Sequence, residues 1–209
     1  MEGRAKPTHE AEWRRTVKRA FDGEDLTDAE IARLDEISTP AYETLGAPRV
    51  GEDAEADAWI IEVRKASTPD EIAAVLKEFR GYRVVALVTC DGVPIYSHGG
   101  QYEGVDETSF RGAILAGCTS ILPQALIDDA WEHKLPEEAV SYGRSLLDLA
   151  RTAQPKEAAP SKPGFLARFG LAKPPSDQLP FPEQVKAVDA AGRWFVYWGE
   201  RGHAIRAWY

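Results

Sequence analysis

The strongest strand signal of the chain lies directly beside a two-residue turn. An apolar, valine-rich run covers residues 83–90, a second β-branched run covers 93–97, and Asp91-Gly92 separates them. Asp-Gly between two such runs predicts a hairpin, because a type I′ turn needs positive φ at both central residues. The first run lacks strict alternation, which is typical of a strand covered on both faces. We therefore predict a hairpin over residues 83–98 at the centre of a sheet.

The C-terminal residues 183–209 contain three apolar runs that turn-forming residues separate, at Ala191-Gly192 and at 199–202. This pattern predicts a three-stranded antiparallel meander. In such strands Trp194 and Trp198 would face the same side. The predicted fold class is α+β, a central antiparallel sheet built from the hairpin and extended by the meander, flanked by about six α-helices.

Two helix starts carry a capping box. Thr27 stands three residues before Glu30, and Thr68 stands three residues before Glu71 with Pro69 at the first helical position. In this motif the threonine hydroxyl and the glutamate carboxylate each bond an otherwise unpaired backbone N–H. We therefore expect helices to begin directly after Thr27 and Thr68.

Apolar spacing and proline positions predict further helices over 8–22, 109–122, 123–134 and 136–153. In the helix after Thr27, the buried face would hold Ile31, Leu34 and Ile37. Glycines and acidic residues over 42–58 predict an exposed loop. The run 59–63 fits a short strand or a helical turn equally well.

Composition divides the chain into three parts. Residues 1–153 form the predicted main α+β domain, and 154–182 form a proline-rich linker or arm. Within the arm, segment 162–173 is apolar and basic. Residues 183–209, the predicted meander, are expected to pack on the main domain.

The net charge of −9 and the pI of about 5.0 argue against a nucleic-acid partner, which would need a basic surface. Two cysteines, Cys90 and Cys118, are too few for a disulfide scaffold, and both lie in apolar runs typical of reduced thiols. The N-terminus has no apolar signal region, and no apolar run is long enough to span a bilayer. We therefore expect a cytoplasmic protein.

The pair Cys90 and His98 resembles a thiol and its base, but the predicted hairpin separates them. Val93 would pair with Cys90, and His98 would lie about 16 Å further along the ladder. No residue spacing matches a metal-ligand or cofactor-binding pattern. We predict no catalytic residue, no metal and no cofactor.

The glycine-rich loop 98–106 follows the predicted hairpin and precedes a helix, a place where backbone N–H groups can hold a ligand. Its candidate ligand-binding residues are His98, Gln101, Tyr102 and Glu103. In the alternative interpretation the glycines only allow a tight bend, and Asp106 or Thr108 caps the next helix.

Aromatic residues and arginines, which are enriched in interface hot spots, gather in two places. The candidate partner-binding residues are Phe165 and Phe169 in the arm and Trp194, Trp198 and Arg201 in the predicted meander. Alternatively, the C-terminal aromatics form the core of their own sheet, and segment 162–173 folds back onto the main domain.

These features predict a non-enzymatic cytoplasmic protein that binds another protein, such as a basic one, through its acidic surface and aromatic C-terminal sheet. A regulator, an adaptor or an inhibitor such as an immunity protein would fit. The alternative is a small-molecule-binding domain or enzyme with its site at loop 98–106.

Overall fold

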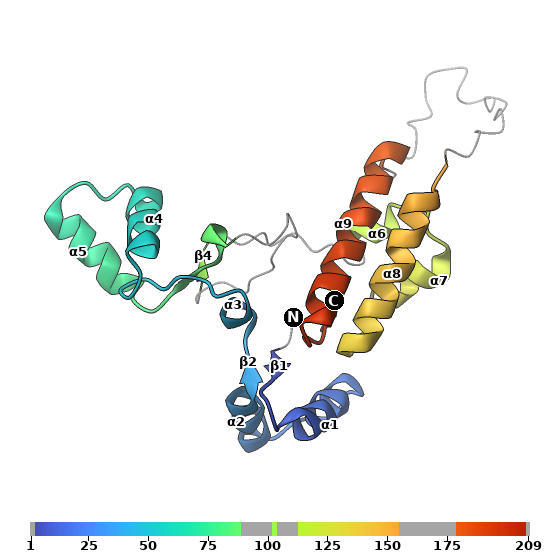
Figure 1. The fold of residues 1–209 in the computed structure, drawn as a ribbon, viewed down its shortest axis with the longest axis horizontal. Helices are drawn as coiled ribbons and strands as arrows, with labels where there is room; N and C mark the ends of the chain where they lie inside the picture. The colour runs from blue at the N-terminus through green and yellow to red at the C-terminus, as the bar shows by residue number, and fades with distance from the viewer. Residues whose placement is uncertain (1–2, 89–101, 104–112, 155–178, 208–209) are drawn as a thin grey trace, which may run out of the picture.

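The chain is described by a computed structural model, which places residues 3–88, 102–103, 113–154 and 179–207. These residues are mainly helical, and their buried apolar side chains form three separate clusters. Figure 1 shows the corresponding groups of helices, with α1–α2 at the bottom, α4–α5 at the left and α8–α9 at the right. None of the described helices is both long and apolar enough to cross a membrane.

The largest cluster is built on an antiparallel helix pair, α8 (Pro136–Thr152) and α9 (Phe181–Glu200) (Figure 1). The two backbones approach closely because glycines face the partner helix. A Cβ atom on Gly143 would lie 2.7 Å from the Gly192 carbonyl oxygen, and one on Gly192 would lie 2.9 Å from the Gly143 carbonyl oxygen. Short α6 (Ala113–Ala116) and α7 (Gln124–Asp129) precede α8, and both contribute to the same cluster.

Helix α9 replaces the predicted C-terminal meander, which is wrong. Its buried residues recur at intervals of three and four, the spacing of one helix face: Gln184, Val188, Ala191, Phe195 and Trp198. Pro182 lies in the first turn, where a proline is compatible with a helix. The apparent turn at Ala191-Gly192 lies inside the helix, where the missing Gly192 side chain serves packing against α8.

The predicted central sheet is also wrong. In its described part, residues 83–88, the valine-rich run forms a two-residue strand, β3 (Arg83–Val84), and continues as a 3₁₀ turn, η1 (Val85–Leu87). Strand β3 pairs in parallel with β4 (Tyr102–Glu103). The run is buried without a large sheet, because Val84 of β3 belongs to the cluster of α4 and α5 and Val85 of η1 is also buried. The predicted turn Asp91-Gly92 and the second strand lie outside the described residues.

Helices α1 (Glu10–Phe21) and α2 (Asp28–Ile37) form the second cluster with a short antiparallel ladder, β1 (Arg4–Ala5) and β2 (Ser38–Thr39). The capping box at Thr27 is confirmed, since its hydroxyl accepts the Glu30 N–H. Thr8 is not the cap of α1. His9 occupies that position, and Thr8 has a φ of 71°, a left-handed backbone conformation that is uncommon for threonine.

The third cluster belongs to α4 (Ala54–Arg64) and α5 (Pro69–Glu78). The predicted loop over 42–58 is wrong at both ends, because α3 (Ala41–Thr44) and α4 are helical. Alanines favour the helix, and Glu55 and Asp57 stabilise the positive end of the α4 dipole. The capping box at Thr68 is confirmed.

The C-terminal residues after α9 tie these parts together. Lys134 and Ile205 exchange backbone hydrogen bonds of 2.9 and 2.8 Å, and His203 forms a β-bridge with Arg4. The His203 side chain is fully buried, and its Nε2 lies 2.8 Å from the Thr44 hydroxyl of α3. This single histidine therefore contacts two segments that are distant from it in the sequence, at Arg4 and at Thr44.

The Glu71 capping box is expected to make stability depend on pH. Hydrogen bonds from the backbone N–H groups of Ser67 and Thr68 lower the pKa of the Glu71 carboxyl from 4.5 to about 2. Because the folded-state pKa is the lower one, this contribution is present above about pH 4.5 and is lost as the pH falls through about 2. Glu71→Gln should lower Tm at pH 7 and leave it nearly unchanged at pH 2, measured by circular dichroism. Glu78→Gln, on the exposed face of the same helix, is the control, and an equal loss for Glu71→Gln at both pH values would contradict this account.

Candidate functional site

Two of the predicted partner-binding residues lie in the core of the helix pair. Trp194 and Trp198 are 2% and 0% exposed, so neither side chain presents a contact surface. Arg201 is exposed, and its guanidinium carbon lies 3.5 Å from the centre of the Tyr197 ring. Phe165 and Phe169 lie outside the described residues, and their role stays a prediction.

The predicted ligand loop is described only at β4. His98 and Gln101 lie outside the described residues, and for Tyr102 and Glu103 the backbone alone is described, paired with Arg83 and Val84. A ligand site at loop 98–106 therefore stays a prediction.

Cys118 is a buried, free thiol on the side of the helix pair. Its Sγ donates a hydrogen bond of 3.4 Å to the Ile114 carbonyl oxygen, and burial raises its pKa to about 11. It is therefore protonated at neutral pH and a poor nucleophile. Within the ranges that the structure describes, no three His, Cys, Asp or Glu side chains lie close enough to hold a metal ion.

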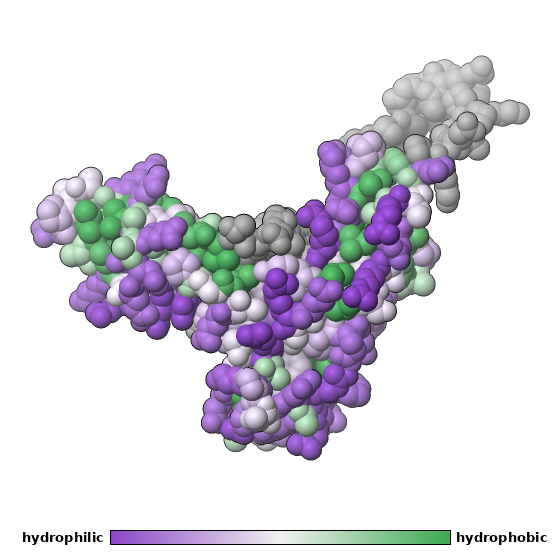
Figure 2. Space-filling model, viewed as in Figure 1, coloured by the Kyte–Doolittle hydropathy of each residue, from purple (hydrophilic) through white to green (hydrophobic). Residues whose placement is uncertain are grey.

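A groove between α1 and α2 combines apolar and acidic residues, and we call it the acidic groove. Its volume is about 340 Å³. The apolar lining consists of Val17, Ala20, Phe21, Leu26, Ile31 and Leu34, and the charged lining consists of Glu24, Asp25, Asp35 and Arg206. On the face drawn in Figure 2, the α1–α2 group is mainly hydrophilic, with a few apolar residues between the charged ones.

The apolar floor arises because α2 carries more apolar residues than its neighbours cover. Of the three residues predicted to be buried on α2, Ile37 is 1% exposed, Leu34 is partly buried and Ile31 is 47% exposed. Few large apolar residues in the described part of the chain are as exposed as Ile31. Ile31 lines the groove together with Leu26 and Leu34, and neighbouring apolar residues with polar residues at their edge are typical of a contact surface.

The acidic rim comes from the connection between the helices and from α2. Glu24 is paired with Arg19, at 2.7 Å between Oε2 and Nε. For the side-chain carboxylates of Asp25 and Asp35, the structure records no hydrogen bond or ion pair with any described residue. Because Arg19 compensates Glu24, two further carboxylates, of Asp25 and Asp35, stand against the guanidinium of Arg206 among the lining residues and leave the groove negatively charged.

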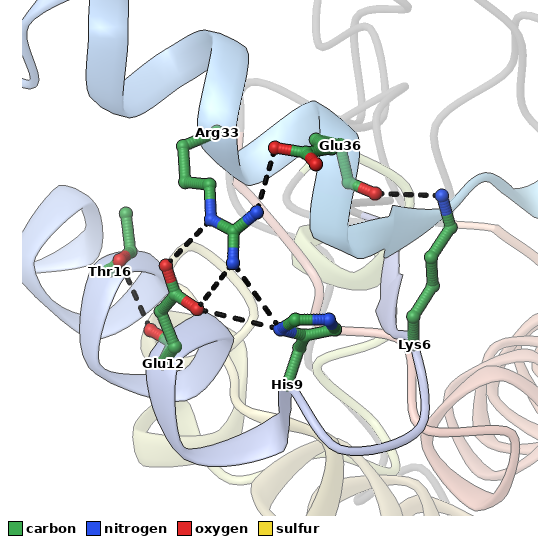
Figure 3. Close-up of polar contacts among 6 residues, drawn as sticks. All are labelled: Lys6, His9, Glu12, Thr16, Arg33 and Glu36. Atoms are coloured by element: carbon green, nitrogen blue, oxygen red, sulfur yellow. Dashed lines mark hydrogen bonds and ion pairs between the residues drawn. The ribbon is translucent and has the colours of Figure 1, made fainter.

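A polar network fixes the two walls of the groove relative to one another (Figure 3). Arg33 of α2 binds both carboxylate oxygens of Glu12 of α1, at 2.8 and 3.0 Å, and also binds Glu36 at 2.7 Å. His9 Nδ1 lies 3.4 Å from Arg33 Nη2. The hydrogen bond from Arg33 lowers the pKa of Glu12, which therefore stays ionised at neutral pH.

A second connection lies further along the same helices, where Arg19 of α1 binds Glu30 of α2 at 2.6 Å. Several charge-assisted bonds between the walls hold the groove open before any partner arrives, which reduces the entropy lost on binding. Sequence reasoning missed this groove. The available signals were the acidic run after α1 and the apolar Ile31 beside it.

The arrangement is suited to contact with a partner, since it offers an apolar floor and acidic edges without a nucleophile or a metal-ligand set among its lining residues. Comparison of the chain with protein-family models, curated proteins and solved structures found no match.

Proposed function

We propose that the protein works by binding another protein, and that the acidic groove receives a basic amphipathic helix of that partner. The observation that carries the proposal is the exposed Ile31 at the edge of an apolar floor, beside the carboxylates of Asp25 and Asp35, which have no partner among the described residues. Amphipathic helices commonly bind in apolar grooves through residues spaced at i, i+3, i+4 and i+7.

Charge decides which helix fits. Three carboxylates line the groove and the whole chain carries a net charge of −9, so a cationic helix is attracted and an anionic one is repelled. The partner helix would place its apolar side on Leu26, Ile31 and Leu34 and its lysines or arginines beside the rim. A regulator, an adaptor or an inhibitor of a basic protein would work in this way.

For the compartment we propose the cytoplasm. Cys118 supports this proposal, because a buried thiol without a disulfide is typical of proteins from reducing compartments.

A synthetic peptide tests the groove directly. The probe is a fluorescent 18-residue helical peptide with leucine at i, i+3, i+4 and i+7 and lysine elsewhere, and binding is followed by fluorescence anisotropy. Ile31→Gln removes the apolar contact and should raise Kd about tenfold. Val63→Gln is the matched control, because Val63 is also 47% exposed but lies on α4.

The rim is tested by neutralising Asp25 and Asp35 together. Asp25→Asn/Asp35→Asn should raise Kd about fivefold at low ionic strength, and the difference should disappear in about 0.5 M NaCl because salt screens exposed charges. Glu62→Gln/Glu78→Gln removes two exposed carboxylates from α4 and α5 and serves as the charge control. Equal effects of Ile31→Gln and Val63→Gln, or equal binding of a peptide with glutamate in place of lysine, would contradict the proposal.

A further inference from the structure

A second surface has the opposite charge. Three arginines surround a hollow of about 330 Å³ between α3 and the end of α5, in a chain that is strongly acidic as a whole. We call it the arginine hollow, and its lining residues are Tyr42, Glu43, Arg49, Arg80, Gly81, Tyr82 and Arg83.

The backbone forces two of these arginines together. Residues 48–50 and 81–84 run antiparallel, with hydrogen bonds from Val50 N to Tyr82 O of 2.9 Å and from Gly81 N to Val50 O of 2.8 Å. Arg49 and Arg83 are therefore directly opposite one another in a β-bridge. Like charges at such positions are unfavourable unless an anion or another acceptor compensates them.

Two glycines with positive φ make room for the arginine side chains. Gly81 has a φ of 89°, and a Cβ atom on it would lie 3.1 Å from Arg49 Nη2. Gly51 has a φ of 83°, and a Cβ atom on it would lie 3.1 Å from Arg80 Cγ. Because Gly81 and Gly51 have no side chain, the Arg49 and Arg80 side chains can lie directly against the backbone there, at the hollow that both arginines line.

Acceptors among the described residues use only some of the arginine donors. Arg49 donates from Nε to the Gly81 carbonyl oxygen at 2.9 Å and from Nη1 to Glu52 at 2.8 Å, and Arg83 donates from Nη1 to the Ala47 carbonyl oxygen at 2.9 Å. For Arg80, no hydrogen bond or ion pair to any other described residue is recorded. Since a guanidinium carries five N–H donors, several stay available to a ligand that enters the hollow.

We propose that the arginine hollow binds a small, hydroxyl-rich organic phosphate, such as a sugar phosphate. Guanidinium groups match phosphate oxygens in pairs, and a dianion compensates several of the clustered positive charges. The volume lies at the small end of the range for ligand pockets. Glu43, Tyr42 and Tyr82 line the same hollow and carry the polar groups that would hydrogen-bond to sugar hydroxyls. This site is independent of the acidic groove, which lies on other helices.

Isothermal titration calorimetry of the full chain with ribose 5-phosphate tests the site, with ribose and inorganic phosphate as comparison ligands at constant ionic strength. We expect ribose 5-phosphate to bind with a Kd below about 1 mM and more tightly than either comparison ligand, because both of its parts have contacts in the hollow. Arg80→Gln should raise that Kd about tenfold, the effect of losing a charge-assisted hydrogen bond. Arg15→Gln is the matched control, since Arg15 is an exposed arginine of α1 far from the hollow along the chain.

Arg80 is exposed and its loss should leave Tm within about 2 °C of the wild-type value, so weaker binding would not reflect unfolding. Arg83→Gln should weaken binding to a similar degree. The Tm of this variant measures how much the hydrogen bond from Arg83 to the Ala47 carbonyl oxygen contributes to stability. We take a Kd of about 10 mM as the upper limit of specific binding. The proposal would be overturned if ribose 5-phosphate did not bind at about 10 mM, or if the wild type and Arg80→Gln bound it with equal affinity. Equal affinity for inorganic phosphate would overturn the assignment to an organic phosphate.

Discussion

Replacing Trp198 with alanine is expected to lower the free energy of unfolding by about 4 kcal/mol, the usual cost of emptying a tryptophan-sized site in a core. Trp198 is 0% exposed, belongs to the largest apolar cluster, and its ring lies edge-on to His203 at 5.0 Å between centroids. For a chain of this length the loss corresponds to a fall in Tm of roughly 8–16 °C. Urea unfolding monitored by circular dichroism at 222 nm measures it.

Trp198→Phe is the informative partner variant. The indole Nε1 of Trp198 is buried and has no hydrogen-bond acceptor among the described residues, so phenylalanine keeps most of the apolar contact and removes an unpaired donor. We expect a loss below about 2 kcal/mol. If Trp198→Ala instead left stability unchanged and weakened a protein complex, Trp198 would be a partner contact and the buried position on α9 would be contradicted.

Replacing Gly199 with valine is expected to cost about 3 kcal/mol or more, because the two helices must separate to admit the side chain. A Cβ atom on Gly199 would lie 2.6 Å from the Pro136 carbonyl oxygen and 3.0 Å from the Val140 backbone nitrogen. Backbone atoms of α8 cannot move aside individually as a flexible side chain can. The same urea experiment measures the effect.

Glu200→Val is the matched control, since it introduces the same side chain at the neighbouring, exposed position of α9. It removes the surface ion pair with Arg144 and should change stability by less than about 1 kcal/mol. Similar losses for the two variants would show that helix propensity, and not the close approach of α8 and α9, determines the cost at Gly199.

The two proposed binding surfaces differ in charge and in location. The acidic groove lies on α1 and α2, whereas the arginine hollow lies between α3 and the end of α5. Variants of one surface should therefore leave binding at the other unchanged.

Local signals in the sequence predicted the helix starts well. The capping boxes at Thr27 and Thr68 depend only on residues within one helical turn, so no distant contact can alter their meaning. The helix predicted over 136–153 has the same character, because Pro136 and two acidic residues mark its first turn, and α8 spans Pro136–Thr152. For the groove, the sequence placed Ile31 on the correct helix but on a buried face.

The errors arose where residues suit either a strand or a helix. The aromatic run of α9 alternates like a strand over five residues, and only the longer interval from Gln184 to Trp198 shows the helical period. Glycines were interpreted as turns at Gly192 and Gly199, although both are packing positions against α8. A glycine in a turn and a glycine at a helix packing position look the same in the sequence. Only the presence of a neighbouring helix distinguishes the two.

The sequence by itself determined the acidic character of the chain and the capped starts of α2 and α5, because these properties depend on composition and on contacts within one helical turn. Only the tertiary structure decided that Trp198 is core, that Ile31 is exposed, and that Arg49 and Arg83 lie opposite one another. Burial and charge clustering depend on which distant segments cover a residue. In this protein the covering and contacting segments include residues 203–207, α3 and β3. No local sequence pattern specifies which residues these segments reach.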